Sequence, residues 1–292
     1  MMIGEVYAIY ILSELYLWLG HKRALELAEA TFAFVDPGGH DGQFGGYYQD
    51  YRKTAYDPAN IRKNASTNLH MLLALARLAE ASPNPVYRER LMQLYELLPR
   101  FVHTQSGHAY WALTRRWHPI PFDEGINNRT MYGHNAELVW YMYEAVPVLE
   151  RDQEQLVPFL AKIMDGFLRD GMSPEGAVYF FGPIVGPSDD KRILWWAQAE
   201  AMVAFLRLYR LSGDGRYWAS FERVAEWTFE HVIPDDEPAA WWGVLDEDGN
   251  VTDGYRGGAN WKSGFHVARA LLEIERDLDS LIVREEDLER HE

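Results

Sequence analysis

Residues 193–212 read ILWWAQAEAMVAFLRLYRLS, a helix-forming stretch that is apolar nearly all round. A helix without a polar face must be surrounded by other elements of the protein. Four more stretches share this character: 5–19, 66–82, 132–149 and 260–276. Amphipathic stretches, which have one polar side, alternate with them at 21–35, 86–104, 153–170 and 215–232. The sequence therefore predicts buried inner helices that alternate with outer helices.

The inner helices recur at a nearly constant interval. They begin near residues 5, 66, 132, 193 and 260, so the intervals are 61, 66, 61 and 67 residues. A repeat of this length, with one inner and one outer helix in each unit, is typical of an α/α array. We expect a single all-α domain over residues 1–292, a toroid of the (α/α)6-barrel type that is incomplete at its N-terminus, with about five of six repeats. The turn-rich stretch LDEDGNVTDGYRGG (245–258) predicts a short hairpin.

Composition excludes several function classes. The chain has 28 basic and 44 acidic residues, a net charge of −16, whereas nucleic acid or an anionic membrane requires a basic face. The apolar start MMIGEVYAIYILSELYLWLG lacks a basic region and a cleavage site and contains Glu5 and Glu14, so it predicts a buried helix rather than a signal peptide or a membrane span. The absence of cysteine excludes a thiol nucleophile, a disulfide and a thiolate metal site. We expect a cytoplasmic protein that binds neither nucleic acid nor membrane.

Polar and aromatic residues recur in the first two turns of the inner helices. Because these helices are expected to run in the same direction, their first turns meet at one mouth of the toroid. The candidate site residues are Tyr7, Asn68, His70, His134, Glu137, Trp195, Trp196, Gln198, Glu200, Trp261 and His266. Three histidines at a matching position in three repeats are hard to explain by packing, and they predict a functional site.

The residue types favour proton transfer over other chemistries. The positive end of a helix dipole disfavours the imidazolium form, so a histidine there is available as a base, and the same end stabilises a developing anion. Zinc is an alternative for three histidines, but the chain has no HxH or HExxH pair. A glycosidase needs two carboxylates that flank a bond, for which Glu137 and Glu200 are candidates. Each follows a histidine or tryptophan by one turn, which is more typical of an orienting group.

The motifs that carry these residues resemble the N-acylglucosamine 2-epimerase superfamily, especially its cellobiose 2-epimerase and aldose–ketose isomerase branches. The matching motifs are YGHNAE (132–137), WWAQAE (195–200) and WKSGFH (261–266), and further similar stretches follow in family order along the whole chain. The family fold is an (α/α)6 barrel, in agreement with the repeat.

The resemblance implies a role for each matching residue. His134 and His266 match the acid/base pair at the sugar C2, and His70 matches a histidine that acts in ring opening and proton relay. Glu137 would orient His134. The tryptophans Trp195, Trp196 and Trp261 would wall the pocket and stack on the sugar. The implied reaction removes the C2 proton of an opened mono- or disaccharide aldose to give a cis-enediolate, and reprotonation at C2 gives the epimer or at C1 the ketose. It needs no metal and no cofactor.

The chain departs from the family pattern in three places. Family members begin with three further helices, one of which carries an arginine that contacts substrate, and without them the toroid is open on one side. Three explanations are open: a partner chain, such as a second copy, covers that side, the true start of the protein lies upstream, or the chain is a degenerate relative. Ala240 precedes Trp241 where the family often has glutamate, and Ser66 replaces an asparagine of cellobiose epimerases. Two alternatives to an epimerase or isomerase therefore remain open: a non-catalytic carbohydrate-binding relative and an (α/α)6 glycoside hydrolase.

Overall fold

The computed structural model of the chain describes residues 2–49, 62–120, 128–237, 240–253, 262 and 264–289. The chain forms two compact units, each of which is described by itself. The first comprises residues 1–130 and 141–153, and the second comprises residues 131–140 and 154–292. Helix α5 (Tyr132–Val148) contributes residues up to Trp140 to the second unit and those from Tyr141 on to the first.

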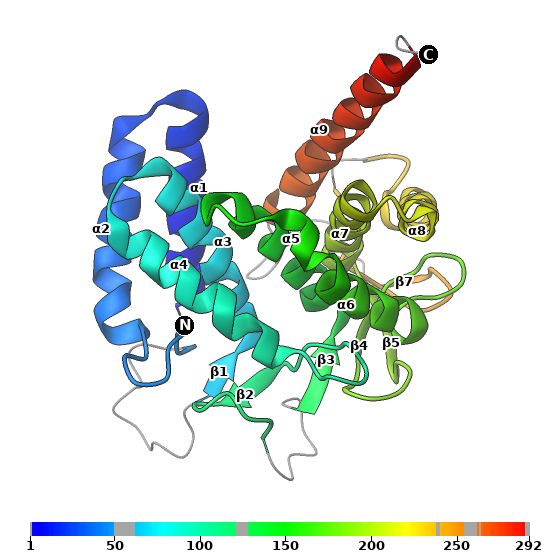
Figure 1. Cartoon of the computed structure of the whole chain (residues 1–292). Coiled ribbons are helices and arrows are strands. Elements are labelled where there is room, and N and C mark those ends of the chain that lie inside the picture. Colours follow the sequence, from blue (N-terminus) through cyan, green and yellow to red (C-terminus); the bar gives the residue numbers. More distant parts are fainter. Residues whose placement is uncertain are drawn as a thin grey trace. The chain divides into compact units, whose positions relative to one another are not determined.

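The first unit consists of two helical hairpins and a short antiparallel strand pair (Figure 1). Its helices are α1 (Ile3–Leu19), α2 (Lys22–Gly39), α3 (Ala65–Ala81) and α4 (Pro85–Leu97), and a 3-10 turn (Leu98–Phe101) follows α4. Strand β1 (Arg62–Asn64) pairs with β2 (Ala112–Thr114). The side chain of Asn64 caps α3 by accepting a hydrogen bond from the Thr67 backbone N–H at 3.3 Å. Helix α3 is buried on nearly all sides, as its apolar sequence predicts.

The second unit combines four more helices with an antiparallel sheet. The helices are α6 (Val157–Asp170), α7 (Trp195–Ser212), α8 (Gly215–Trp227) and α9 (Gly264–Glu289), with short helical turns at Gln153–Leu156 and Thr228–Val232. Strands β4 (Tyr179–Pro183), β5 (Asp190–Leu194), β6 (Val244–Leu245) and β7 (Val251–Asp253) follow one another in the sheet. Helix α7 is buried along almost its whole length.

A strand leads directly into each of three inner helices. β1 ends at Asn64 and α3 begins at Ala65, and β5 ends at Leu194 before α7 begins at Trp195. In the same way β3 (Arg129–Met131) runs straight into α5. These strands were not expected from the sequence, because runs of three to five residues are too short to show a strand period. Their effect is to fix the direction in which the chain enters each inner helix.

The predicted helices agree with the structure within a few residues, and the ends of α4 and α9 differ most. Helix α9 begins at Gly264 rather than 260 and runs on to Glu289, and α4 ends at Leu97 rather than 104. The predicted hairpin is confirmed by β6 and β7, which pair on either side of a turn closed by Asp246.

The expectation that the N-terminal helix is buried was wrong for one face of α1. Trp18 and Leu19 are 65% and 74% exposed there, because the described part of the chain packs on α1 from α2 and α3.

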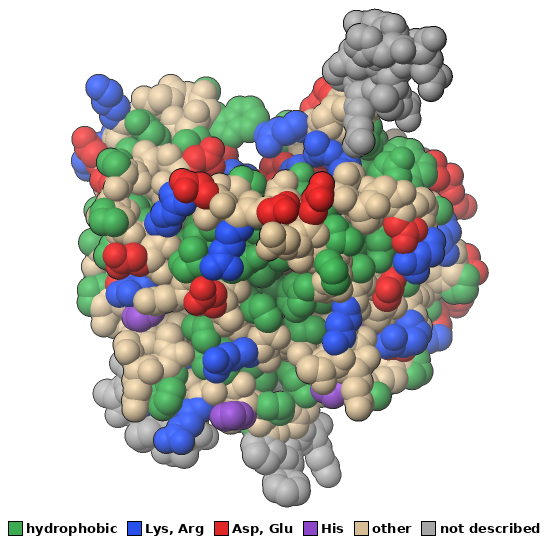
Figure 2. Space-filling model, viewed as in Figure 1, with side chains coloured by type: hydrophobic (Ala, Val, Ile, Leu, Met, Phe, Trp, Pro, Cys, Tyr) green, Lys and Arg blue, Asp and Glu red, His purple; other side chains and the backbone are tan. Residues whose placement is uncertain are grey.

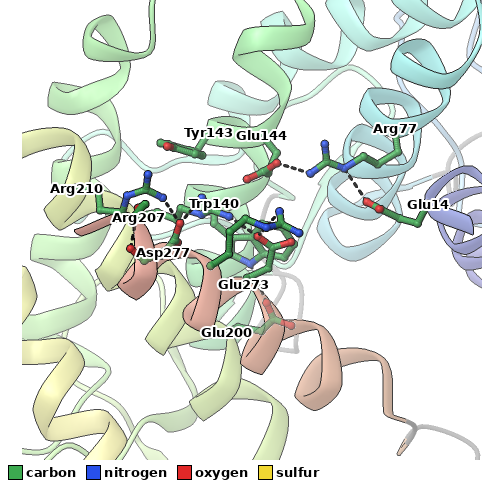
Figure 3. A network of polar contacts seen from close by, with 12 residues as sticks. Glu14, Arg77, Trp140, Tyr143, Glu144, Glu200, Arg207, Arg210, Glu273 and Asp277 are labelled. Carbon is green, nitrogen blue, oxygen red and sulfur yellow. Dashed lines mark hydrogen bonds and ion pairs between the residues drawn. The ribbon is translucent and has the colours of Figure 1, made fainter. Parts of the chain in front are cut away.

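Buried ion pairs join α7 to α9 along their length (Figure 3). Arg207 Nη1 lies 2.7 Å from Asp277 Oδ1, and the same guanidinium contacts Glu273. Arg210 also contacts Asp277, whose side chain is completely buried. Charged groups are placed inside a protein only with partners, since isolated burial is very unfavourable. These ion pairs therefore fix the register of α9 against α7.

The surface carries charges of both signs. On the face shown in Figure 2, Lys and Arg side chains are interspersed with Asp and Glu. Among the described helices, none is sufficiently long and apolar to cross a membrane.

A buried carboxylate in the first unit accepts from two cations. Asp41 lies 3.0 Å from Lys63 Nζ and 2.8 Å from Arg115 Nε, and its side chain is completely buried. Burial alone would raise the pKa of Asp41, but the hydrogen bonds from Arg115 and Lys63 outweigh it and hold the pKa well below its usual range. Burial lowers the pKa of Lys63 to about 8, so this amine is still protonated at pH 7.

We expect the Asp41→Asn variant to be less stable than the wild type at neutral pH, with a difference that shrinks in acid. The folded state lowers the pKa of Asp41, so its contribution is present above the unfolded value of 3.8 and is lost as the pH falls toward the folded value. Urea unfolding of both proteins between about pH 7 and pH 2 measures this difference. A difference that does not depend on pH would contradict the assigned role of the ionised carboxylate.

Candidate active site

Three helices of the second unit bring charged and aromatic side chains together near their first turns. Helix α5 contributes three residues at a spacing of three, and α7 and α9 each contribute a pair about one turn apart, so each set lies on one helix face. The residues are His134, Glu137 and Trp140 of α5, Trp196 and Glu200 of α7, and His266 and Arg269 of α9. We call this group the histidine cluster. His134 and His266 are each the third residue of their helix.

His266 is held by Glu200. Its Nδ1 lies 2.5 Å from Glu200 Oε1, and because a carboxylate oxygen only accepts, Nδ1 is the donor. The neutral ring then has its lone pair on Nε2, the atom that can act as a base. The Trp140 indole N–H donates to Glu200 Oε2 at 2.8 Å, and the Arg269 guanidinium donates to Oε1. Both oxygens of Glu200 therefore accept from protein donors, and the side chain orients His266.

Glu137 lies between the two histidines. Its Oε2 is 3.7 Å from His134 Nε2, and its Oε1 is 3.8 Å from His266 Nδ1. These distances are too long for hydrogen bonds, but a completely buried carboxylate at this range still stabilises positive charge on either ring. The resemblance assigned Glu137 to His134 alone, whereas the structure places its carboxylate equally near both rings.

The indole of Trp196 contacts both imidazoles. Its ring centroid lies 5.5 Å from that of His134 and 5.3 Å from that of His266, with interplanar angles of 44° and 40°. A flat apolar surface beside two imidazoles suits the C–H face of a sugar. Gly133 makes this position available, because a Cβ there would lie 2.3 Å from Trp196 Cζ3.

We expect the Gly133→Ala variant to lose about 1–3 kcal/mol of stability and to displace Trp196, because the added methyl group overpacks the site. Turnover should fall with it. Gly215→Ala is the matched control, since a Cβ at that position meets nothing within 4 Å. Urea unfolding and steady-state kinetics of both variants check this. A Gly133→Ala variant as stable and active as Gly215→Ala would show that the contact is not tight.

His70 forms a pair with Tyr7 in the first unit. His70 Nδ1 lies 2.7 Å from the Ser66 carbonyl oxygen and is therefore a donor. The Tyr7 hydroxyl lies 3.1 Å from Nε2, and in the neutral ring it must donate to that atom. The rings of Tyr7 and Tyr141 meet His70 edge-on. A phenol that donates to an imidazole is an arrangement that can pass a proton.

Two predicted substrate-binding amides instead hold the backbone. Asn68 accepts from the Tyr47 N–H at 2.8 Å and donates to its carbonyl at 3.0 Å, and it is completely buried. Gln198 does the same for Val178, at 3.2 and 3.0 Å. Both ends of each amide pair with the main chain, which gives these side chains a structural role, and their predicted binding of substrate stays a prediction. Glu200 is placed to orient His266, and its predicted binding of substrate also stays a prediction.

The remaining predicted residues are two tryptophans. Trp195 is 6% exposed, and its indole N–H has no hydrogen-bond partner among the residues that the structure covers. A buried donor of this kind fits a ligand hydroxyl or a water molecule. Trp261 lies outside the described residues.

Two residues of the histidine cluster were missed at the sequence level. Trp140 follows Glu137 by three residues, and Arg269 follows His266 by three, so the helix period was a signal that could have found both.

Three donor atoms, from Glu137, Glu200 and His266, lie within 4.8 Å of one another, which is close enough for one cation. A search for an HExxH motif does not find this group, because its members come from three different helices. Arg269 already brings a positive charge to Glu200, and we assign no metal.

Comparison with known proteins places the chain in context. The N-acylglucosamine 2-epimerase (GlcNAc 2-epimerase) family profile matches residues 5–270. The cellobiose 2-epimerase of Ruminococcus albus is 27% identical over 280 residues, covering 92% of this chain and 69% of the relative. The N-acylglucosamine 2-epimerase of Rattus norvegicus is 34% identical over 169 residues, covering 52% and 37%. The solved cellobiose 2-epimerase of Spirochaeta thermophila superposes with a TM-score of 0.81 at 28% identity, covering 95% of this chain and 70% of that one. Cellobiose 2-epimerases are (α/α)6 barrels, so the predicted fold class is confirmed.

Proposed function

Since this chain belongs to the N-acylglucosamine 2-epimerase family and is an enzyme of the isomerase class, we propose that it moves the C2 proton of a free reducing sugar by histidine acid/base catalysis. The product is the C2 epimer of the aldose or the corresponding ketose. The sugar is a mono- or disaccharide, and no metal takes part.

The proposed step uses the open-chain aldehyde. Nε2 of one histidine of the cluster takes the proton from C2, the electron pair forms a C1=C2 double bond, and the carbonyl oxygen becomes the enediolate oxygen. The other histidine returns a proton to the opposite face of C2, and the C1 carbonyl forms again to give the epimer. Alternatively, a proton is delivered to C1 while the hydroxyl proton of O2 passes to O1, which leaves the C2 carbonyl of the ketose. Glu137, which lies near both rings, stabilises whichever imidazole carries the extra proton.

The observation that carries this proposal is the pairing of His266 with Glu200. A hydrogen bond at 2.5 Å from Nδ1 directs the lone pair to Nε2, and His134 lies on the same tryptophan as His266. Two imidazoles beside one indole ring can transfer protons to and from the two faces of one carbon atom. The Trp195 indole N–H is a further donor for a sugar hydroxyl.

The cluster argues against the glycosidase alternative. A glycosidase requires one carboxylic acid that donates a proton and a second carboxylate that acts as nucleophile or base. Glu200 does not suit the role of the acid, since both of its oxygens accept from protein donors and the Arg269 cation favours the ionised carboxylate. The carbohydrate-binding alternative uses the same tryptophans without turnover.

Product analysis tests the proposal. Purified protein is incubated separately with mannose, glucose, N-acetylglucosamine and cellobiose, and the sugars are separated by chromatography. An epimer or a ketose from at least one of them is expected. Saturable binding of a sugar without any product would favour the carbohydrate-binding alternative, and release of reducing ends from an oligosaccharide would favour a hydrolase.

The predicted ring-opening role of His70 stays a prediction, which the His70→Ala variant tests. A ring-opening defect should slow turnover of the cyclic sugar, while exchange of the C2 proton from an open-chain aldose analogue should be spared. Equal slowing of both reactions would contradict the role.

The predicted second copy also stays a prediction. The exposed apolar face of α1, which contains Ile11, Trp18 and Leu19, is the part of the first unit that it would cover. Sedimentation equilibrium should give the mass of a dimer, and the Trp18→Glu variant should give that of a monomer. A wild-type monomer at micromolar concentration would contradict the prediction.

A further inference from the structure

We propose that Arg269 is a positioning residue for the reaction: it fixes the Glu200 carboxylate beneath His266 and thereby keeps the proton of the neutral imidazole on Nδ1. This inference rests on the proposed function for its kinetic consequence, but its structural consequence is independent of turnover. Arg269 lies one turn after His266 on α9, and its side chain is 8% exposed.

The first observation is that one oxygen serves two donors. Glu200 Oε1 accepts both from His266 Nδ1 and from the Arg269 guanidinium. Without Arg269, the Trp140 N–H on Oε2 would be the remaining donor besides His266. The carboxylate could then rotate away from the imidazole. A rotated carboxylate no longer selects the tautomer, and the ring then divides its proton between Nδ1 and Nε2.

The second observation is that Arg269 itself is held rigidly. Its guanidinium carbon lies 4.2 Å from the centroid of the Trp140 ring and 4.9 Å from that of Phe265. The planar cation is thus in contact with two aromatic rings, an arrangement that favours arginine over lysine and restricts its motion. Trp140 contributes twice, because the same indole that contacts the guanidinium donates to Glu200.

The third observation is the charge around the site. Glu137 from α5 and Glu200 from α7 are both completely buried, and both have an oxygen within 4 Å of His266 Nδ1. A buried pair of carboxylates needs a compensating cation. Arg269 is a permanent cation in contact with Glu200, one of this pair, so the imidazole is not the only source of positive charge beside the two carboxylates.

The test compares Arg269→Met with Arg269→Lys in the chain of residues 1–292. Arg276→Met is the matched control, since Arg276 lies on the same helix with a half-exposed side chain near Glu273. Met keeps the length of the side chain without its charge, and Lys keeps the charge. We expect kcat to fall about 100-fold in Arg269→Met, with KM little changed, and about 10-fold or less in Arg269→Lys. Arg276→Met should match the wild type.

The decisive readout is the nitrogen NMR spectrum of the labelled histidines. The wild type should show His266 with the proton on Nδ1, and Arg269→Met should show a mixture of both tautomers. His70 is an internal control, because its Nδ1 donates to a carbonyl oxygen in the first unit and its signals should not move. If Arg269→Met does not fold, Arg269→Gln replaces it, which donates an N–H without a charge and should show the same mixture.

An unchanged His266 tautomer in the folded, uncharged variant would overturn the proposal, and so would equal losses of kcat in Arg269→Met and Arg269→Lys. If the wild type converts no sugar, the proposed function fails, whereas the tautomer measurement still decides the role of Arg269.

Discussion

The His266→Ala variant should lose about 10²–10⁴-fold in kcat while it keeps the wild-type fold. In the proposed mechanism the imidazole accepts or returns the C2 proton through Nε2, and the neighbouring Arg269 is a guanidinium that cannot act as a base in its place. The loss should appear in kcat more than in KM, because the proposal assigns contact with the sugar to Trp196, which the substitution does not remove. The same result is expected for His134→Ala.

His118→Ala is the control for this measurement, since His118 is an exposed histidine of the first unit. Circular dichroism and urea unfolding of each variant establish that the fold is kept. Wild-type turnover by either His266→Ala or His134→Ala would show that the mechanism is wrong.

The Asp277→Ala variant should be destabilised by about 3–5 kcal/mol. Asp277 is completely buried and contacts both Arg207 and Arg210 (Figure 3), so its removal leaves the buried guanidinium of Arg207 with less compensation. The loss of one partner of a buried pair is far more harmful than the loss of an exposed one, because the remaining charge stays inside the protein.

Asp214→Ala is the matched control. Asp214 pairs with Arg216 at 2.7 Å, but the Arg216 side chain is 62% exposed and water can replace the partner. Its removal should change stability much less than the removal of Asp277, and the change should come mainly from the lost cap of α8. Urea unfolding curves of the two variants decide between the outcomes, and equal destabilisation would contradict the role given to burial.

The inner helices could be predicted because a helix that is buried on all sides has a sequence that is apolar nearly all round. Helix α7 begins at Trp195 and ends at Ser212, within two residues of the predicted 193–212. The hairpin at 244–253 was predictable from its Asp and Gly residues, which favour a tight turn. Strands β1, β3 and β5 were not, because their pairing depends on segments that are distant in the sequence.

The residue types of the site could be predicted from the sequence, but the contacts that each side chain makes could not. The helix phase brought His134 and His266 onto one tryptophan, as the repeat suggested. It did not reveal that Asn68 and Gln198 pair with the main chain, since an amide at a helix start suits a ligand and a backbone equally well. Nor did it reveal Arg269, because a single arginine on a helix is usually a solvated residue.

The most direct test of the mechanism is proton exchange at C2. The converted sugar is incubated with the protein in D2O, and the C1 and C2 protons are followed by NMR, with His266→Ala as the comparison. Base-mediated removal predicts that deuterium enters C2 of the product with the wild type and that the rate of entry falls with the variant. A product that keeps its original hydrogen throughout would contradict proton transfer to the histidines.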